Sequence, residues 1–304
     1  RAGLDDDGKP TAWFHHNASE PITPDVSPGI ASLFPDWVPM VARKVLAKSV
    51  RGAMESGAIP ELTAMEGSKP PYDVENTQLE FTPIKTALPV CYWRSVGHSY
   101  NGFVVESFID ELAHAAGADP YEYRRELLGP EQQRLRGVLD TAAEHGNWGE
   151  SLPDGFGRGI ASHTSFDTHV AEVVEAGIVD GEIEIDRIVC AVDCGVVVNP
   201  DIVKAQMEGG IIYGLSAALS EKITLTDGRV DQGNFDDFPA VRMHESPDIE
   251  VHIVQTGAAP TGVGEPGLPP AAPALAHPLF DATGVRLRSM PFNDALAEHD
   301  MSQG

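Results

Sequence analysis

The sequence predicts a mixed α and β protein of the α+β class, made of two subdomains. Before about residue 150, apolar residues recur at helical spacing, whereas after about residue 159 they alternate with polar ones, as in half-buried strands. With 42% hydrophobic residues in a chain of 304, one large or two ordinary domains can bury a core. We therefore expect subdomains at 1–150 and 151–304, meeting near residues 140–160.

The first predicted element is a hairpin. Asp7-Gly8 is a turn signal, and a strand-like segment follows at 11–14. Because the preceding strand is very short, we expect a partner strand for 11–14 on another chain, as in a fragment or a split subunit. Residues 17–90 are expected to be irregular apart from one helix at 39–56.

Three further helices complete the first subdomain. Apolar spacing predicts a helix at 103–116, which ends at Gly117, a residue common after a helix C-terminus. Asp119 is a good N-cap for the next helix, which runs to about residue 128. A last helix is predicted at 131–144.

Strands dominate the second subdomain. The segments 169–178 and 182–192 read as strands, and Asp180-Gly181 between them favours a two-residue hairpin. In the second strand, Ile183 and Ile185 alternate with acidic residues, and the strand then becomes apolar through Cys190, as if it enters a core. The remaining predictions are a helix at 200–219 with Asn199 as its N-cap, a hairpin turn at 227–228, a strand at 248–255, a helix at 268–282 and a final strand at 285–292.

Composition excludes several classes of function. The formal net charge is −25, which argues against a nucleic-acid surface and against anionic lipid. Three cysteines cannot form a disulfide framework or a four-cysteine metal site, and the histidines show no ligand spacing, so we expect no metal bound by His or Cys. The sequence contains no run of about 18 apolar residues, so we expect no membrane-spanning helix.

The most informative motif is a glycine- and proline-rich turn at 262–267 that contains Glu265. Gly262, Gly264 and Gly267 match the dinucleotide fingerprint, but Glu265 would repel a pyrophosphate and too few residues follow for a Rossmann half. The other interpretation makes Glu265 a general base presented at the start of a helix. The two interpretations predict different cofactors.

The helix at 200–219 carries a row of small and polar residues, namely Gln206, Gly210 and Gly214. Glycine inside a helix costs roughly 0.5–1 kcal/mol relative to alanine, so something must approach this face closely. One explanation is tight packing against a strand. The other is a flat ligand that lies beside the Gln206 amide, which can donate and accept hydrogen bonds.

Four blocks of sequence carry a family resemblance. Residues 263–274 resemble the signature around the catalytic glutamate of molybdenum hydroxylases, the xanthine dehydrogenase and aldehyde oxidase family. The version of the motif in this chain resembles that of the large subunit, or β-subunit, of isoquinoline 1-oxidoreductase and of related bacterial aldehyde dehydrogenases. The other blocks, in chain order, are 92–112, 193–210 and 286–292.

The resemblance implies part of a molybdopterin-binding domain, with the C-terminal part of a first subdomain at 1–150 and a second at 151–304. It implies Glu265 as general base in the oxidation of an aldehyde or N-heterocycle with oxygen derived from water. The cofactor is of the molybdopterin type, with the cytosine dinucleotide form as one alternative, and no protein side chain ligates the metal. The residues expected to bind it are Arg94, Ser95, Val96, Gly97, Gln206, Gly210 and Gly264.

The family's partners follow from the same resemblance. We expect the N-terminal half of the molybdenum subunit on another chain, a subunit with [2Fe–2S] clusters, a cytochrome c or other electron acceptor, and a small-molecule substrate. The GGFGRR-like loop of the family is missing from this chain, so activity is expected only with the other half. Such enzymes occur in the bacterial cytoplasm and periplasm. The alternative is a non-catalytic interaction subunit of the same fold. Glu265 argues against it, because an inactive relative need not keep an acid in this turn.

Overall fold

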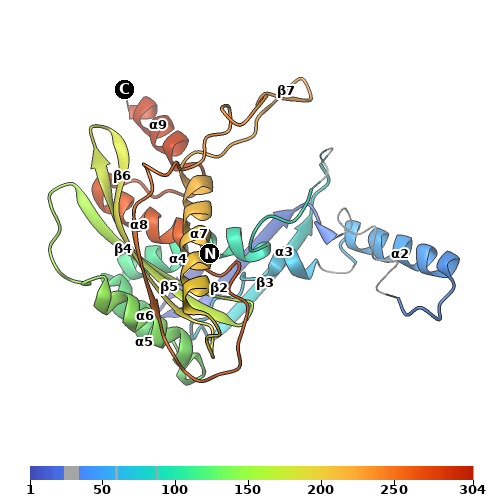
Figure 1. Ribbon diagram of the computed structural model, residues 1–304, viewed down its shortest axis with the longest axis horizontal. Helices are drawn as coiled ribbons and strands as arrows, with labels where there is room; N and C mark the ends of the chain where they lie inside the picture. Colours follow the sequence, from blue (N-terminus) through green and yellow to red (C-terminus); the bar gives the residue numbers. More distant parts are fainter. Residues whose placement is uncertain (24–33, 59–60, 87, 89, 304) are drawn as a thin grey trace.

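The computed structural model describes residues 1–23, 34–58, 61–86, 88 and 90–303 and shows a mixed α+β fold, as predicted (Figure 1). The strands are β1 Ala2–Leu4, β2 Pro10–Ser19, β3 Asn76–Pro83, β4 Phe156–Ser165, β5 Thr168–Val179, β6 Glu182–Asp193, β7 Leu225–Thr226, β8 Arg229–Val230 and β9 Asp248–Ile253. The helices are α2 Met40–Glu55, α3 Leu62–Met65, α4 Gly97–Ala116, α5 Pro120–Leu127, α6 Gln133–His145, α7 Pro200–Leu219, α8 Ala271–Thr283 and α9 Phe292–Gln303, with a 3-10 turn η2 at Pro130–Gln132.

The main sheet has the order β4-β5-β6-β9, in which β9 runs parallel to β6 and the other neighbours are antiparallel. Alternating residues of β5 and β6 face two different cores. Val174 and Ile188 belong to the core that contains α7 and α8, whereas Val173 and Val189 belong to the core that contains α6. The sheet is therefore covered by helices on both faces.

Local signals placed several elements correctly. Asp180 and Gly181 both have positive φ, 52° and 87°, as the turn of the β5–β6 hairpin requires. The Asp119 side chain accepts hydrogen bonds from the backbone N–H groups of Tyr121 and Glu122 and so caps α5. Gly117 ends α4 in the left-handed conformation, at φ 65°.

The predicted final strand at 285–292 is wrong. Residues 285–291 are irregular, and α9 begins at Phe292. Arg286 and Arg288 form ion pairs with Asp110 and Glu111, which hold this segment along helix α4 and away from a sheet edge. Leu287 is buried in the core that contains α7 and α8 without any strand pairing.

The N-terminal region is more regular than predicted. β3, within the segment expected to be irregular, pairs in parallel with β2 over residues 12–19. Ala12 has Gly3 of β1 on one side and Asn76 of β3 on the other, so the expected partner strand on another chain is not needed for this segment. The sequence hid β3 because its residues are mostly exposed and lack an apolar alternation. β4 was also not predicted.

The predicted boundary between subdomains at residue 150 falls between helix α6 and the main sheet, although α6 packs on that sheet. α6 lies before the boundary and packs on β5 and β6, which lie after it. The two subdomains therefore stay a prediction.

Figure 1 shows helix α2 at one end of the longest axis, away from the sheet. Val41 and Val45 on this helix, and Trp37 just before it, are largely exposed. In the described part of the chain, no helix is long and apolar enough to cross a membrane.

Candidate active site

Glu265 lies in the turn that joins the chain after β9 to helix α8. The two halves of this turn differ in exposure: Gly262 and Gly264 are exposed, whereas residues 266–270 are buried. The buried prolines fix the second half against the core, and the first half leaves its backbone open. Glu265 stands at the border between them, half-buried.

Ser95 holds the glutamate from a segment 170 residues away in the sequence. Its backbone N–H donates to Glu265 Oε1 at 3.0 Å, and its hydroxyl donates to the Glu265 carbonyl oxygen at 2.8 Å. Ser95 and Val96 adopt positive φ angles of 70° and 49°. Such non-glycine conformations cost about 1–3 kcal/mol each and are typical of functional sites. Here they direct the Ser95 N–H at the carboxylate.

Gly97, the first residue of α4, permits a close approach of the short helix α3. A Cβ on Gly97 would lie 2.2 Å from the Thr63 carbonyl oxygen, which no real Cβ tolerates. The buried Asn101 side chain strengthens this contact, because it donates to the carbonyl oxygens of Ala64 and Glu66. α3 and the start of α4 therefore form one rigid support beside Glu265.

This support brings two acids that sequence reasoning missed. The pKa of Glu66 is raised by burial, and repulsion from Glu265 and then from Glu61 raises it further. Glu61 is 1% exposed and accepts hydrogen bonds from the backbone and hydroxyl of Thr23. No motif surrounds either acid in the sequence, so only the fold reveals that they share the Glu265 region.

The Arg94 guanidinium connects the turn to helix α7. Its Nε donates to the Gly264 carbonyl oxygen at 2.9 Å, Nη2 bonds the same oxygen, and Nη1 donates to Gly209 O at 3.0 Å. Nη2 also reaches the Gln206 carbonyl and side-chain oxygens, both at 3.4 Å. These partners belong to the protein itself, so this geometry makes Arg94 a positioning residue for the turn.

The glycine row of α7 receives the turn rather than leaving open space. A Cβ on Gly210 would lie 3.2–3.3 Å from backbone atoms of Gly267 and Leu268, and one on Gly214 would lie 3.1 Å from Leu268 O. Of the two explanations that the sequence offered, the geometry favours tight packing. The glycine face of α7 packs against the turn at 262–267 and Leu268, and not against a strand. A direct contact of Gly210 with a cofactor stays a prediction.

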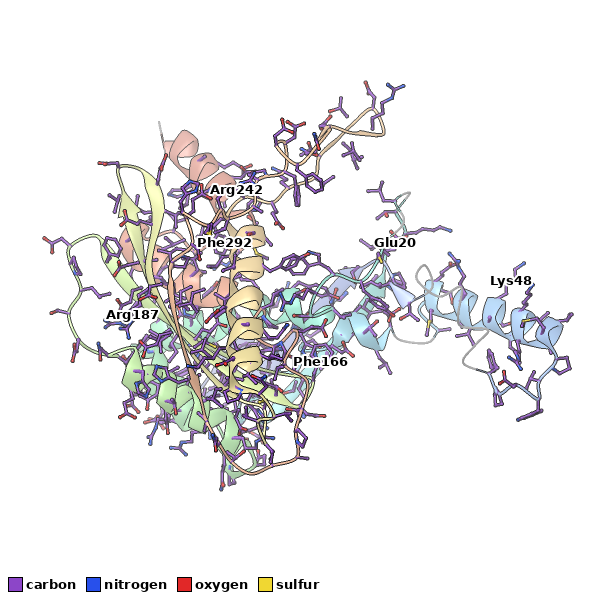
Figure 2. All side chains as sticks on the ribbon, in the orientation of Figure 1. Glu20, Lys48, Phe166, Arg187, Arg242 and Phe292 are labelled. Atoms are coloured by element: carbon purple, nitrogen blue, oxygen red, sulfur yellow. The ribbon has the colours of Figure 1, made fainter. Side chains whose placement is uncertain are left out.

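Two histidines and an aromatic ring stand beside this turn. His98 Nδ1 and His163 Nε2 share a hydrogen bond of 2.9 Å, and the His98 ring lies 5.4 Å from that of Phe166. Burial lowers the pKa of His98 to about 4 and that of His163 to about 3, so both are neutral at pH 7. Phe166, labelled in Figure 2, lies at the tip of the β4–β5 hairpin, and a Cβ on Gly262 would lie 3.7 Å from its Cβ.

Comparisons with known proteins identify the family of the chain. Two family models, both described as molybdopterin cofactor-binding domains, match residues 41–128 and 109–247, together more than half of the chain. The β-subunit of isoquinoline 1-oxidoreductase from Brevundimonas diminuta is 38% identical over 232 residues, which are 75% of this chain and 30% of that protein. The chain belongs to the molybdenum hydroxylase family.

Other members of the molybdenum hydroxylase family extend the match. One of the subunits of nicotinate dehydrogenase from Pseudomonas putida is 32% identical over 271 residues, 81% of this chain and 22% of that protein. The chain thus spans less than a third of these curated relatives. The crystal structure of quinoline 2-oxidoreductase from Pseudomonas putida 86 shares the fold, with a TM-score of 0.67 at 13% identity over 75% of this chain and 55% of that one.

The molybdenum hydroxylase family implies a molybdenum–pterin cofactor, and the open side of the turn fits such a group. A Cβ on Gly264 would meet only Gln206 Oε1, at 3.7 Å, so a large ligand can approach this backbone beside an amide. Arg94 holds the Gln206 oxygen, which presents the amide NH2 as a donor. The start of α4 has no side-chain cap, and a helix N-terminus favours negatively charged ligand groups.

A nucleotide site of the Rossmann type does not fit. Such a site needs a second parallel strand after the helix that follows the glycine motif. In the part of the chain that the structure describes, α8 is followed by α9, and no strand lies beyond Gly267. The glycines at 262, 264 and 267 serve the turn that presents Glu265.

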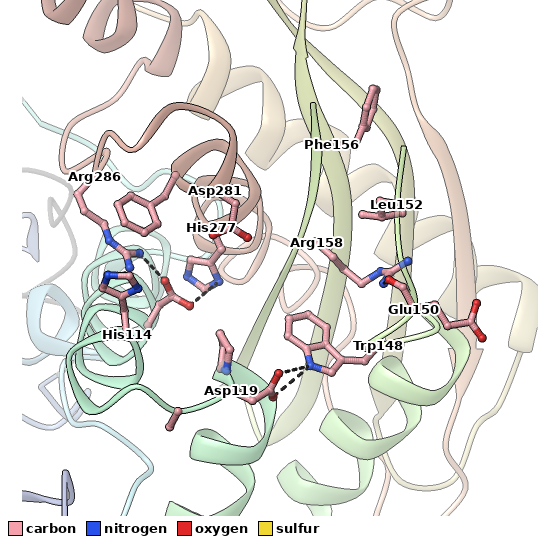
Figure 3. A pocket seen from close by; sticks show the side chains of 15 residues that line it. His114, Asp119, Trp148, Glu150, Leu152, Phe156, Arg158, His277, Asp281 and Arg286 are labelled. Atoms are coloured by element: carbon pink, nitrogen blue, oxygen red, sulfur yellow. Dashed lines mark hydrogen bonds and ion pairs between the residues drawn. The ribbon is translucent and has the colours of Figure 1, made fainter. Parts of the chain in front are cut away.

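A separate pocket of about 410 Å³ lies between α4, α8 and the start of β4 (Figure 3). Asp110 is flanked there by Arg286, His277 and the fully buried Arg124, and burial lowers the pKa of His277 to about 4. None of the residues that line this pocket belongs to the turn at 262–267. These charges lie apart from that turn, and their ion pairs join α4, α5, α8 and the segment after α8.

Proposed function

We propose that this chain is the part of a molybdenum hydroxylase large subunit that carries the general base, Glu265. One observation supports this most: the Ser95 N–H holds Oε1, and no residue of the described part donates a hydrogen bond to Oε2. A carboxylate fixed through one oxygen presents the other in a defined position. Its task is to take a proton from water-derived oxygen as that oxygen attacks the substrate carbon.

The other residues keep this carboxylate in place. When bound, the cofactor supplies a metal centre that activates oxygen derived from water and accepts two electrons. Ser95 orients Glu265, and Arg94 fixes the Gly264 carbonyl against α7. The open backbone of Gly264, the Gln206 amide and the segment from Ser95 to Gly97 would hold the cofactor, with the cytosine dinucleotide form still an alternative.

The names of the relatives favour an N-heterocycle as substrate. Isoquinoline 1-oxidoreductase, nicotinate dehydrogenase and nicotine 6-hydroxylase are each named for such a ring. A membrane-bound aldehyde dehydrogenase of Gluconacetobacter polyoxogenes, 33% identical over 66% of this chain, keeps an aldehyde as the second class. We propose that the remaining half of the large subunit and a [2Fe–2S] subunit complete the enzyme, and that a cytochrome c or another acceptor takes the electrons.

The test is Glu265→Gln in the assembled complex. Glutamine keeps the shape and can accept the Ser95 hydrogen bond but cannot take the proton, so we expect kcat to fall by at least about 100-fold. Molybdenum and pterin content should stay near the wild-type level. The control is Glu208→Gln, an exposed acid on α7 two residues from Gln206, which should leave kcat unchanged.

Retention of more than a tenth of wild-type kcat in Glu265→Gln would remove this residue from the mechanism. If the wild-type complex also contains no molybdenum or pterin, the alternative of a non-catalytic interaction subunit replaces the proposal. Metal and pterin analysis of the wild-type complex therefore accompanies the kinetics.

A further inference from the structure

Three side chains that can ligate a metal converge far from Glu265. His145 is the last residue of α6, and Glu250 and His252 stand two positions apart on β9, so both point to the same side of the strand. One ligand atom from each residue lies within 4.8 Å of the other two. The sequence concealed this cluster, because His145 is separated from the other two by more than 100 residues.

Rigid elements hold the three residues. β9 pairs in parallel with β6, where Glu250 is opposite Val189 and His252 is opposite Ala191. α6 packs on that same sheet, so its last residue is fixed relative to β9. The His145 and His252 rings are stacked, with centroids 3.7 Å apart and 13° between their planes.

The contact between His252 and Glu250 is close but unsatisfied. His252 Nε2 lies 2.7 Å from Glu250 Oε1, yet this buried nitrogen makes no hydrogen bond of good direction, because the oxygen lies off the line along which the ring nitrogen points. A metal ion ligated by both atoms would satisfy the nitrogen and the carboxylate together. The presence of two imidazoles beside one carboxylate distinguishes the cluster from an ordinary group of surface acids.

Arg187 supports the carboxylate from the far side. Its Nη2 donates to Glu250 Oε2 and to the His145 carbonyl oxygen, both at 2.9 Å. This leaves Oε1 directed at the His252 imidazole. The positive charge of Arg187 opposes a second cation, but the negative end of the α6 dipole and the net charge of −25 favour one.

We propose that His145, Glu250 and His252 bind one divalent transition-metal ion, for which Zn²⁺ is the best match. Two imidazoles and a carboxylate with a water molecule form a common zinc ligand set, with bonds of about 2.0–2.2 Å. The ligand atoms lie within 4.8 Å of one another, and both imidazoles bind one ion only if the rings leave their stacked arrangement, because a ring nitrogen binds a metal in the plane of its ring. The ion ties the end of α6 to the edge strand β9.

This site is distinct from the proposed active site. Its ligands on β9 lie opposite Val189 and Ala191 of β6, whereas the turn at 262–267 follows Thr261, whose N–H donates to the carbonyl oxygen of Cys194, just after β6. Figure 2 shows Arg187 and Phe166 on different parts of the molecule. Val189 and Ala191 precede Cys194 by five and three residues, which is roughly 10–17 Å at about 3.3 Å per residue. The zinc proposal therefore stands independently of the proposed function.

The experiment is a zinc titration of the chelator-treated full-length complex by calorimetry, with ZnCl2 alone as probe. We expect one saturable site per chain with a dissociation constant below about 10 µM, and a higher Tm with zinc. His145→Ala and His252→Ala should each weaken binding at least 100-fold. The control is His244→Ala, an exposed histidine 3.9 Å from the Glu245 carboxylate, which should bind zinc as the wild type does.

Absorption spectra with Co²⁺ provide a second readout that does not depend on stability. Visible bands typical of tetrahedral coordination should appear in the wild type and in His244→Ala, and be lost in His145→Ala. Since His145 is exposed, its replacement leaves the core intact. Absence of saturable binding, or equal binding in the wild type and both ligand variants, overturns the proposal.

Discussion

Gly97→Ala tests whether the close approach of α3 to α4 holds the active site together. In an open helical position, alanine in place of glycine stabilises a protein by about 0.4–1 kcal/mol. At Gly97 the new Cβ would lie 2.2 Å from Thr63 O and 3.1 Å from Glu66 N, both backbone atoms that cannot rotate away. Overpacking of this kind costs about 1–3 kcal/mol, so we expect a net destabilisation of about 1–2 kcal/mol.

The matched control is Gly137→Ala in the middle of α6, where a Cβ meets nothing within 4 Å. Thermal and urea midpoints should move in opposite directions in the two variants, because only Gly97 faces a neighbouring backbone. A displaced Gly97 also displaces Ser95, so kcat should fall at least tenfold at unchanged molybdenum content. If Gly97→Ala is as stable and as active as Gly137→Ala, the argument about this contact is wrong.

Three shorter predictions concern packing, pH and buried charge. Gly210→Leu should lower the thermal midpoint while molybdenum per folded protein stays constant, since the side chain meets the backbone of Gly267; a selective loss of metal would instead indicate a cofactor contact. Burial lowers the pKa of His163 to about 3, so between pH 6.5 and about 3 the unfolded chain binds a proton at His163 and the folded chain does not. The contribution of His163 to stability is therefore complete above pH 6.5 and declines as the pH falls, by up to about 1.4 kcal/mol per pH unit. His163→Gln should make the urea midpoint less dependent on pH over this range. Arg124→Met should cost about 3–5 kcal/mol in urea denaturation because it leaves the buried Glu106 unpaired, and adding Glu106→Gln should recover part of that loss.

The sequence predicted those features that depend on a few neighbouring residues. The turn at Asp180-Gly181 and the cap at Asp119 are set by the conformations of the residues themselves, and the structure confirms both. The segment at 285–292 failed, because its conformation depends on ion pairs with a helix about 175 positions earlier. Local alternation cannot distinguish a strand from a chain held against a helix.

The candidate site divides in the same way. Family motifs pointed to Glu265, Arg94 and Ser95, and the structure brings all three together. Glu66 and His163 have no local signal, since each reaches the site only through packing between distant elements. Residues that act through a motif can be found in a sequence, whereas those that act through the fold need coordinates.

The link between Ser95 and Glu265 has a consequence for how the protein matures. Closing a flexible loop of 170 residues costs about 4.5 kcal/mol of chain entropy beyond a constant, so this contact forms only when many other interactions share that cost. Folding dominated by such distant contacts is slow. A partly folded chain therefore has no held carboxylate, and the proposed general base is in place only after these distant segments have met.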